Sequence, residues 1–262
     1  MSALGYHVRI RLESDRQLHT SPAHRRAMAR TIVRVAAPWS LLAFGCAGVH
    51  LHFVALCNHE EAGEIARRLE IGLQRTRSFG VPFLKVHRKE LVDQQHLFSA
   101  VLYDIGQRRH HELAADPYLE ATSAPDLLGA RLLGSHLIPR IREHVPELKR
   151  GHILAAFGLA DSTLASEATD PERLREAVLA AAALPAFSGK GPDMQVARVV
   201  FIALAPPSIR SGDLADLCRV ATRSIPRLRK LPVPPELLRA AGVQLALRQR
   251  VDALTEPARL PG

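Results

Sequence analysis

The alternation of hydrophobic and polar side chains changes character several times along the first 60 residues. Residues 6–12 alternate polar and apolar positions, which predicts a short half-buried strand. Residues 21–37 begin with Ser-Pro and carry an apolar stripe at helical spacing, so we expect a helix there. The apolar run 39–57, interrupted by Gly-Cys-Ala-Gly, predicts two antiparallel strands joined by a short turn.

Two further helices and one further strand are expected before residue 120. Residues 60–77 have the pattern of a basic amphipathic helix, and residues 97–109 that of a helix with one apolar side. Between them, residues 78–87 predict a turn followed by a strand. The resulting β-α-β-β-α-β-α order with antiparallel pairing predicts an α+β fold, an antiparallel sheet with packed helices.

The pattern changes after about residue 120, where strand signals largely vanish and Leu/Ala-rich helical spacing continues to the end. The segment 120–125, rich in small residues and proline, is a candidate linker. We therefore expect an α+β domain at 1–122 and an all-helical domain at 123–262. Within the second domain, residues 212–230 resemble a helix-turn-helix, with residues 222–229 as the recognition helix.

The composition favours an anionic partner. Lys and Arg number 35 against 26 Asp and Glu, which gives a net charge of +9 at pH 7 and a pI near 10.2. Nucleic acid is the first partner that such a charge suggests, and an acidic membrane surface the second. The hydrophobic fraction of 47% is ordinary for globular chains and argues against wholesale disorder.

The cysteines and the apolar stretches indicate where the protein resides. The three cysteines, Cys46, Cys57 and Cys218, form no C-x-x-C pair, so we expect neither a disulfide framework nor a structural zinc site. The longest apolar stretch, 41–57, is too short and too interrupted to span a bilayer, and no apolar leader begins the chain. These features predict a soluble cytoplasmic protein without membrane partners.

Candidate chemistry comes from a pair of histidines and a tyrosine. His50 and His52 stand two apart in the apolar strand, so their side chains share one face and can converge on a divalent metal. Tyr103 and Gln107 stand four apart in a helical segment and also share a face. With 13 histidines in the chain, a structural histidine pair, a core tyrosine and a solvated glutamine remain the alternative interpretations.

Taken together, these four side chains have the composition of a phosphoryl-transfer site. A metal held by two neutral imidazoles and an amide oxygen keeps open positions for a phosphate oxygen and polarises the phosphorus as a Lewis acid. A tyrosine on the neighbouring helix face could attack that phosphorus and form a covalent phosphotyrosine.

These residues also carry a resemblance to a known family. The N-terminal 120 residues resemble the tyrosine HUH single-strand transposases, in particular the REP-associated tyrosine transposase group. The strand Tyr6-His-Val-Arg-Ile-Arg11 is similar to the family's Y-H-V-x-x-R strand, and His50-Leu-His52 to its H-V-H. Tyr103 stands fourteen residues before the proline of an Ala-Asp-Pro, and Gln107 follows it by four, as the family's nucleophile and third metal ligand do.

The sequence also departs from the family's pattern. The family's M-P-N before the first histidine is Ala-Gly-Val at 47–49. The family's I-H-L-N-P-V run after the tyrosine becomes Asp-Ile-Gly-Gln-Arg-Arg-His-His at 104–111. We therefore expect the contacts on the substrate side to have changed, while the ligand set is kept.

The resemblance implies a fold, a reaction and a partner. It implies an HUH-type, ferredoxin-like domain that cleaves and rejoins single-stranded or hairpin DNA, with Mg²⁺ or Mn²⁺ bound by His50, His52 and Gln107. Tyr103 would attack a phosphodiester, leaving a 5′-phosphotyrosine and a free 3′-hydroxyl. The arginines that we expect to contact DNA are Arg67, Arg68, Arg75, Arg77, Arg223, Arg227 and Arg229. The alternative is a solvated helix face for the first four of them and a basic helical hairpin without DNA contact for the last three.

Two other functions are compatible with the same residues. The first is a catalytically silent DNA-binding protein, regulatory or domesticated, that keeps the scaffold. The second is a metal-dependent hydrolase that uses His50 and His52 without a covalent step, against which loss of activity on Tyr103→Phe would count. The sequence is compatible with a monomer and with a homodimer.

Overall fold

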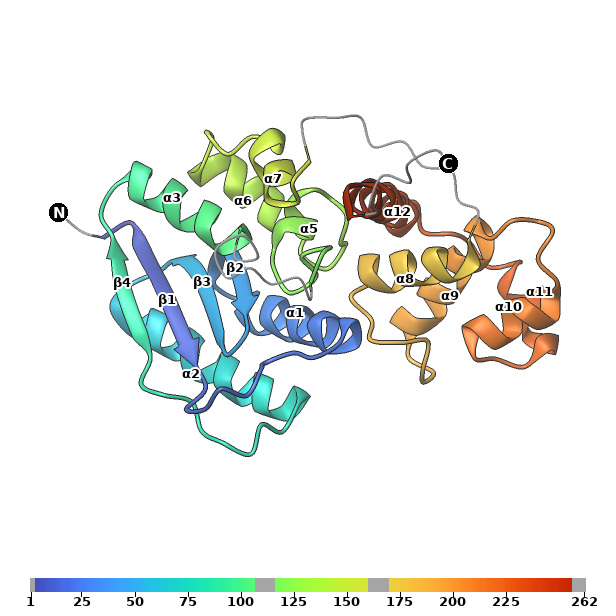
Figure 1. Cartoon of the computed structure of the whole chain (residues 1–262), viewed down its shortest axis with the longest axis horizontal. Helices are drawn as coiled ribbons and strands as arrows, with labels where there is room; N and C mark the ends of the chain where they lie inside the picture. Colours follow the sequence, from blue (N-terminus) through green and yellow to red (C-terminus); the bar gives the residue numbers. More distant parts are fainter. Residues whose placement is uncertain (1–2, 107–115, 160–169, 256–262) are drawn as a thin grey trace, which may run out of the picture.

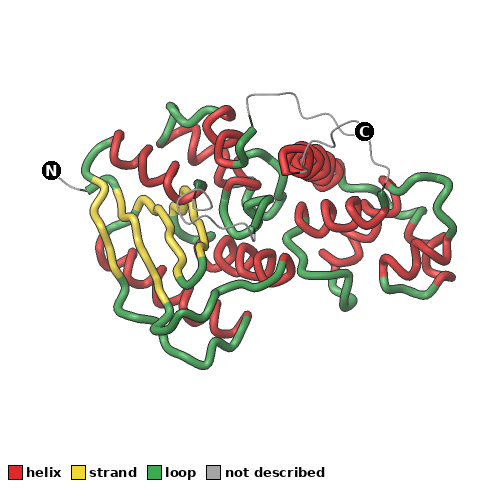
Figure 2. Tube along the Cα trace, viewed as in Figure 1, coloured by secondary structure: helices red, strands yellow, loops and turns green. Residues whose placement is uncertain are grey.

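The computed structural model describes residues 3–106, 116–159 and 170–255. An antiparallel four-stranded sheet lies at one end of the molecule, and helices make up the rest (Figures 1 and 2). The strands lie in the order β2-β3-β1-β4 and have the bounds β1 (Gly5–Arg11), β2 (Ser40–Ala47), β3 (His50–Leu56) and β4 (His87–Leu91). The expected α+β class is confirmed.

The connections interleave two β-α-β units. Helix α1 (Pro22–Ala36) joins β1 to β2, and helix α2 (His59–Thr76) joins β3 to β4. In the sheet, β3 lies between β1 and β2, and β1 lies between β3 and β4. Because all neighbouring strands are antiparallel, the two strands of each β-α-β unit are parallel to each other. Helix α3 (Gln94–Ile105) follows β4.

The two faces of the sheet are covered differently. Helices α1 and α2 pack together on one face, where the ring of Tyr6 lies 5.5 Å from that of His59 on α2. Helix α3 covers part of the other face, where His7 contacts Asp104. Because neighbouring side chains of a strand point to opposite faces, β1 divides its side chains between the two sides. Its apolar positions, such as Val8, are fully buried beneath α1 and α2.

Most elements expected from the sequence in this part are confirmed, and each helix begins at a capping residue. Ser21 caps α1 with proline in the first turn, and Asn58 with Glu61 forms a capping box at α2. The hairpin between β2 and β3 turns at Gly48, whose φ of +56° suits glycine. Asp93 caps α3, which therefore starts three residues before the expected helix at 97.

The strand expected at 78–87 was wrong in its position. β4 begins at His87, where the expected strand ended, and runs to Leu91. Residues 78–86 make one isolated bridge, between Phe83 and Leu12. They also share two backbone hydrogen bonds with the end of β1 and the residues after it: Leu84 N–H donates to the carbonyl of Arg11, and Glu13 N–H donates to the carbonyl of Pro82. Pro82 has no N–H to donate to a ladder, so the apolar residues of this segment pack without forming a continuous strand.

Helices alone follow residue 123 in the described part of the chain, as the sequence predicted. They are α5 (Ala124–Leu127), α6 (Leu137–His144), α7 (Arg150–Ala156), α8 (Pro171–Ala181), α9 (Pro192–Leu204), α10 (Ser211–Cys218), a 3₁₀ turn (Thr222–Ser224), α11 (Ile225–Leu228) and α12 (Pro235–Thr255). None of the helices in the described ranges is long and apolar enough to cross a lipid bilayer.

Two hydrophobic clusters form the interior. The first contains the sheet, its helices and the apolar residues up to Leu159, and the second contains those between Leu174 and Leu245. Helix α12 contributes Leu247 and Val251 to the first cluster and its earlier apolar residues to the second. The expected boundary after residue 122 falls inside the first cluster, and a division into domains stays a prediction.

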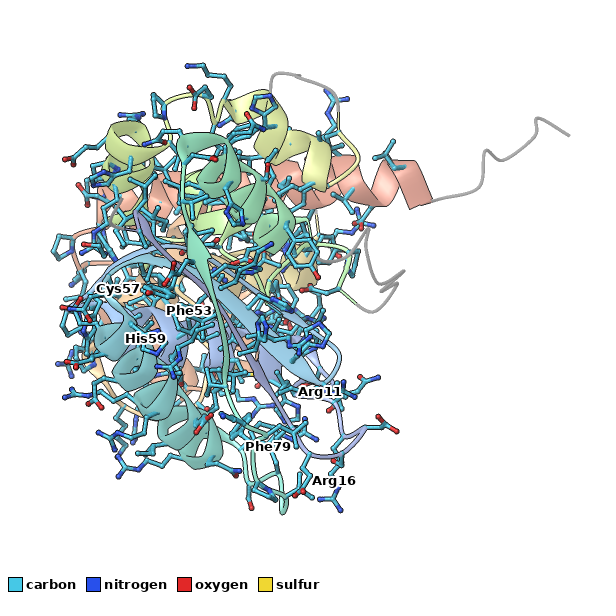
Figure 3. All side chains as sticks on the ribbon, turned by 90° about the vertical axis from the view of Figure 1, so that its left-hand side faces the viewer. Arg11, Arg16, Phe53, Cys57, His59 and Phe79 are labelled. Atoms are coloured by element: carbon cyan, nitrogen blue, oxygen red, sulfur yellow. The ribbon has the colours of Figure 1, made fainter. Side chains whose placement is uncertain are left out.

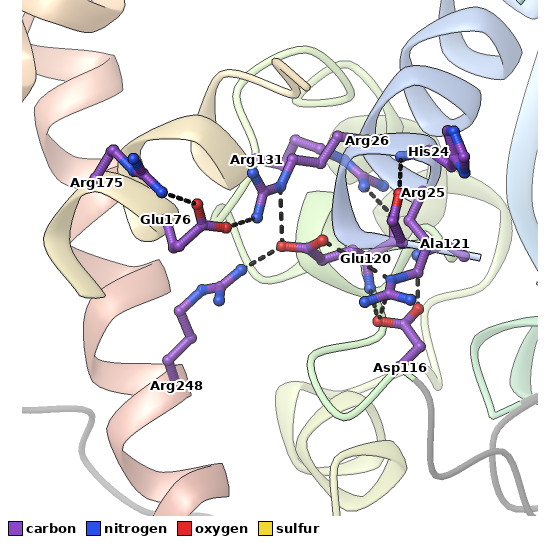
Figure 4. Close-up of polar contacts among 11 residues, drawn as sticks. His24, Arg25, Arg26, Asp116, Glu120, Ala121, Arg131, Arg175, Glu176 and Arg248 are labelled. Atoms are coloured by element: carbon purple, nitrogen blue, oxygen red, sulfur yellow. Dashed lines mark hydrogen bonds and ion pairs between the residues drawn. The ribbon is translucent and has the colours of Figure 1, made fainter. Parts of the chain in front are cut away.

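Buried ion pairs accompany this packing (Figure 4). Glu120, which is 2% exposed, contacts Arg26 of α1 and Arg248 of α12. Arg26 also contacts Glu176 of α8. Arg25, which precedes Arg26 on α1, pairs with Asp116, with 3.1 Å between its Nε and Oδ1 of the carboxylate. These pairs connect helices from both clusters around one carboxylate.

Candidate functional site

The face of the sheet that α3 shares is rich in basic side chains. In the antiparallel register Arg9 lies opposite His52 on one side and His87 on the other, and His7 lies opposite Lys89. Directly opposed residues project to the same face. The same alternation adds two further residues, Arg11 and His50, which are paired with each other. In Figure 3, Arg11 and the α2 residue His59 lie on opposite sides of the strands.

The structure brings three of the sequence-predicted site residues together on this face. The ring centroids of His50 and His52 are 4.8 Å apart, and that of Tyr103 on α3 lies 5.3 Å from His52. His52 is buried, whereas His50 and Tyr103 are half-buried. Gln107, the expected third ligand, lies outside the described residues.

Two residues that the sequence analysis did not assign complete the cluster. His7 lies 5.8 Å from the Tyr103 ring and 5.2 Å from the His52 ring, centroid to centroid. Its Nε2 lies 2.9 Å from Oδ1 of Asp104 and 3.2 Å from Nδ1 of His52. Asp104 is fully buried, and this burial raises the pKa of its carboxyl, although His7 opposes the shift. Its Oδ2 has no hydrogen-bond partner among the residues that the structure describes.

The donor set of this cluster suits a divalent metal ion. One ligand atom each from His7, His52 and Asp104 can be chosen so that all lie within 4.8 Å of one another. Two imidazole nitrogens and a carboxylate oxygen form a mixed set that first-row transition metals accept. The buried Oδ2 of Asp104 is a further unsatisfied acceptor beside them, which a cation would satisfy. The residues present therefore fit a metal.

The basic residues around this cluster differ from those that the sequence analysis selected. Arg9, Arg11, His87 and Lys89 are exposed and share the face of Tyr103. They form a basic rim, a name we use for these four residues. The sequence contained a signal for this rim that the sequence analysis did not use: in β1 the polar residues His7, Arg9 and Arg11 occupy every second position and therefore share one face.

The arginines expected to track DNA from α2 lie on the opposite side of the sheet from Tyr103, because α2 packs on that side. Arg67 and Arg68 both pair with Glu64, and Arg68 also lies over the Trp39 ring at 5.1 Å. The other two are Arg75, which is exposed, and Arg77, which donates to two backbone carbonyl groups. The structure does not bring these four arginines to the candidate site.

The expected recognition helix at 222–229 is divided in the structure. A 3₁₀ turn over Thr222–Ser224 is followed by α11 (Ile225–Leu228), with Pro226 in its first turn, where a missing N–H costs least. The three arginines of this segment are exposed: Arg223, Arg227 and Arg229. α10 and α11 lie at the end of the molecule away from the sheet (Figure 1). DNA contact by this segment stays a prediction.

Comparisons of the chain with protein-family models, with curated proteins and with solved structures found no match. The geometry of the site and the residue pattern of the sequence are therefore the grounds on which a function is inferred.

Proposed function

We propose that the protein is a single-strand DNA transposase or endonuclease of the REP-associated tyrosine type, built on an HUH-type, ferredoxin-like domain. One observation carries this proposal: the ring centroid of Tyr103 lies 5.3 Å from that of His52, on the face of the sheet that also carries the basic rim. Tyrosine can act as a covalent nucleophile when a neighbouring base or a bound metal activates its hydroxyl, and imidazoles can serve as that base or as metal ligands.

The electrostatics of the same face support a polyanionic substrate. The basic rim places guanidinium, ammonium and imidazole groups that are open to solvent on β1 and β4, beside the histidine cluster. Such a surface raises the local concentration of a phosphate backbone and positions it through contacts that do not depend on sequence. The net charge of +9 acts in the same direction.

The proposed reaction exchanges one phosphodiester bond for another. The phenol oxygen of Tyr103 attacks the phosphorus and loses its proton, a new O–P bond forms, and the P–O3′ bond breaks. The departing 3′ oxygen takes up a proton, so the products are a 5′-phosphotyrosine and a free 3′-hydroxyl. Attack by a 3′-hydroxyl on the phosphotyrosine reverses these steps, and rejoining therefore needs no ATP.

A divalent ion at the histidine cluster would neutralise phosphate charge and polarise the phosphorus. The resemblance to the transposase family assigns this ion to His50, His52 and Gln107. The chain itself positions Tyr103 next to β3. Asp93 caps the N-terminus of α3, and α3 packs against the strands β2 and β3.

A covalent-trapping assay tests the proposal. The wild-type protein and Tyr103→Phe are mixed with Mn²⁺ and single-stranded DNA from the regions that flank the gene. We expect an SDS-resistant adduct that mass spectrometry maps to Tyr103 and that the variant lacks.

A wild-type protein that binds this DNA tightly but forms no adduct would instead indicate a catalytically silent DNA-binding protein. Cleavage that Tyr103→Phe leaves unchanged would contradict a covalent step and indicate a metal-dependent hydrolase. Tyr118→Phe is the matched control, because this tyrosine lies away from the cluster and donates to Asp252.

A further inference from the structure

We propose that His7, His52 and Asp104 form a site for a divalent transition-metal ion. The ligand atoms are Nε2 of His7, Nδ1 of His52 and a carboxylate oxygen of Asp104. This site extends the proposed function. Metal binding itself is inferred from geometry alone, and only the role of the ion in strand transfer rests on the proposed function. Its ligand set differs from His50, His52 and Gln107, the set that the family resemblance implies.

Two of the three distances between these atoms match the edges of a coordination polyhedron. Metal–ligand bonds of about 2.0–2.2 Å separate neighbouring ligand atoms by roughly 2.9 Å in an octahedron and roughly 3.4 Å in a tetrahedron. The Nε2 atom of His7 lies 2.9 Å from Oδ1 of Asp104 and 3.2 Å from Nδ1 of His52.

The hydrogen-bonding inventory of the cluster also favours a cation. Nε2 of His7 lies within hydrogen-bonding distance of two atoms, Oδ1 of Asp104 and Nδ1 of His52, and the tautomers of the two rings decide which atom donates. The buried Oδ2 of Asp104 has no hydrogen-bond partner in the described part of the chain. A metal ion would accept lone pairs from all three side chains at once.

The ligands come from three different elements. His7 belongs to β1, His52 to β3 and Asp104 to α3, so an ion would tie the helix to the centre of the sheet. Tyr103 is the neighbour of Asp104, and the ion would therefore fix the helix turn that carries the nucleophile. The side chain of His7 is 18% exposed, which leaves an approach from solvent.

The donor set selects among metals. Imidazole nitrogen suits zinc, iron, cobalt and nickel, and with one carboxylate also manganese, whereas calcium and magnesium prefer oxygen ligands. We therefore expect Mn²⁺, Co²⁺ or Zn²⁺ to bind more tightly than Mg²⁺.

Metal titrations of the full chain test the site. After removal of metals with EDTA, Co²⁺ binding is followed by visible absorption and Mn²⁺ binding by electron paramagnetic resonance. We expect His7→Gln and Asp104→Asn each to weaken binding at least tenfold, and His50→Gln to leave it within a factor of two. Tyr103→Phe should bind metal as the wild-type protein does.

The reverse pattern would overturn the proposal: binding lost in His50→Gln and retained in His7→Gln. Absence of metal binding by the wild-type protein would overturn it as well. Because Asp104 is fully buried, its variant is interpreted only with a native circular dichroism spectrum, and the partly exposed His7 decides the outcome otherwise.

The outcome is separable from that of the proposed function. Metal binding that depends on His7 in a protein that forms no DNA adduct would leave the site standing and remove the function. An adduct on Tyr103 with metal binding that is insensitive to His7→Gln would remove the site and leave the function.

Discussion

Replacement of Glu120 by glutamine should destabilise the protein far more than the same replacement at the surface. The Glu120 carboxylate is 2% exposed, and its Oε1 accepts from Nε of Arg26 at 3.1 Å and from Nη2 of Arg248. Both guanidinium groups are themselves buried. Arg25, also buried, lies 4.0 Å from Oε2 of Glu120, so glutamine keeps the shape of the side chain but removes the negative charge among three buried arginines (Figure 4).

The expected magnitude follows from these contacts. Removal of one partner from a buried ion pair typically costs about 3–5 kcal/mol, because it leaves a buried charge without compensation. Arg26 retains Glu176, a second carboxylate on α8, which reduces the loss on its side. We therefore expect the free energy of unfolding to fall by about 3 kcal/mol, the lower end of that range.

The chain offers a matched control. Glu64 on α2 also contacts two arginines, Arg67 and Arg68, but both of these arginines are exposed. Water and salt screen such contacts, so Glu64→Gln should leave stability unchanged within the error of the measurement. The two glutamates differ in burial while their partners are of the same kind.

Urea unfolding of both variants provides the assay. Circular dichroism reports on the helices of both clusters, whereas fluorescence of Trp39, the single tryptophan, reports on the first cluster alone. We expect the transitions reported by the two probes to coincide, which permits a two-state free energy, and to lie at lower urea in Glu120→Gln than in the wild-type protein. Equal midpoints for Glu120→Gln and Glu64→Gln would refute the reasoning.

Two further predictions concern binding and pH. Arg9→Gln with Arg11→Gln should lower the affinity for single-stranded DNA and flatten its salt dependence, whereas the same changes at Arg67 and Arg68 on the opposite side should not, as measured by fluorescence anisotropy at several salt concentrations. Burial lowers the pKa of His19, so the unfolded chain takes up a proton below about pH 6.5 that the folded state resists. Stability should therefore fall as the pH drops from 7 to 5.5, and His19→Gln should reduce that slope.

Local patterns were sufficient to predict most of the elements around the sheet. Strand and helix periodicities depend on neighbours a few residues apart, and Ser21 followed by proline marks the start of the first helix. The strand at 78–87 was mispositioned because apolar residues in a loop that packs against the core give the same signal as a strand. The sheet order is decided by contacts between distant segments, which periodicity does not encode.

The candidate site was also predictable only in part, because local patterns identify some of its residues and contacts between distant segments identify the others. His50, His52 and Tyr103 carry a residue pattern, whereas Asp104 becomes relevant only through its distance to His7, which lies 97 residues earlier in the chain. The arginines of α2 were selected for their charge, and only the packing of α2 places them on the other side of the sheet.

The assignment of chemistry to one face of the sheet follows from the burial of the other. Val8 and Ile10 are fully buried beneath α1 and α2, so the positions between them are free of packing constraints from that side. At these positions β1 carries His7, Arg9 and Arg11, a polar series with the same period as the apolar one. Any half-buried strand carries polar side chains on its solvated face, but the polar series of β1 consists of one histidine and two arginines, which suits the anionic substrate proposed above. The alternation of β1 therefore gives two predictions: its apolar positions predict the core, and its polar positions predict the face on which the proposed substrate and metal would bind.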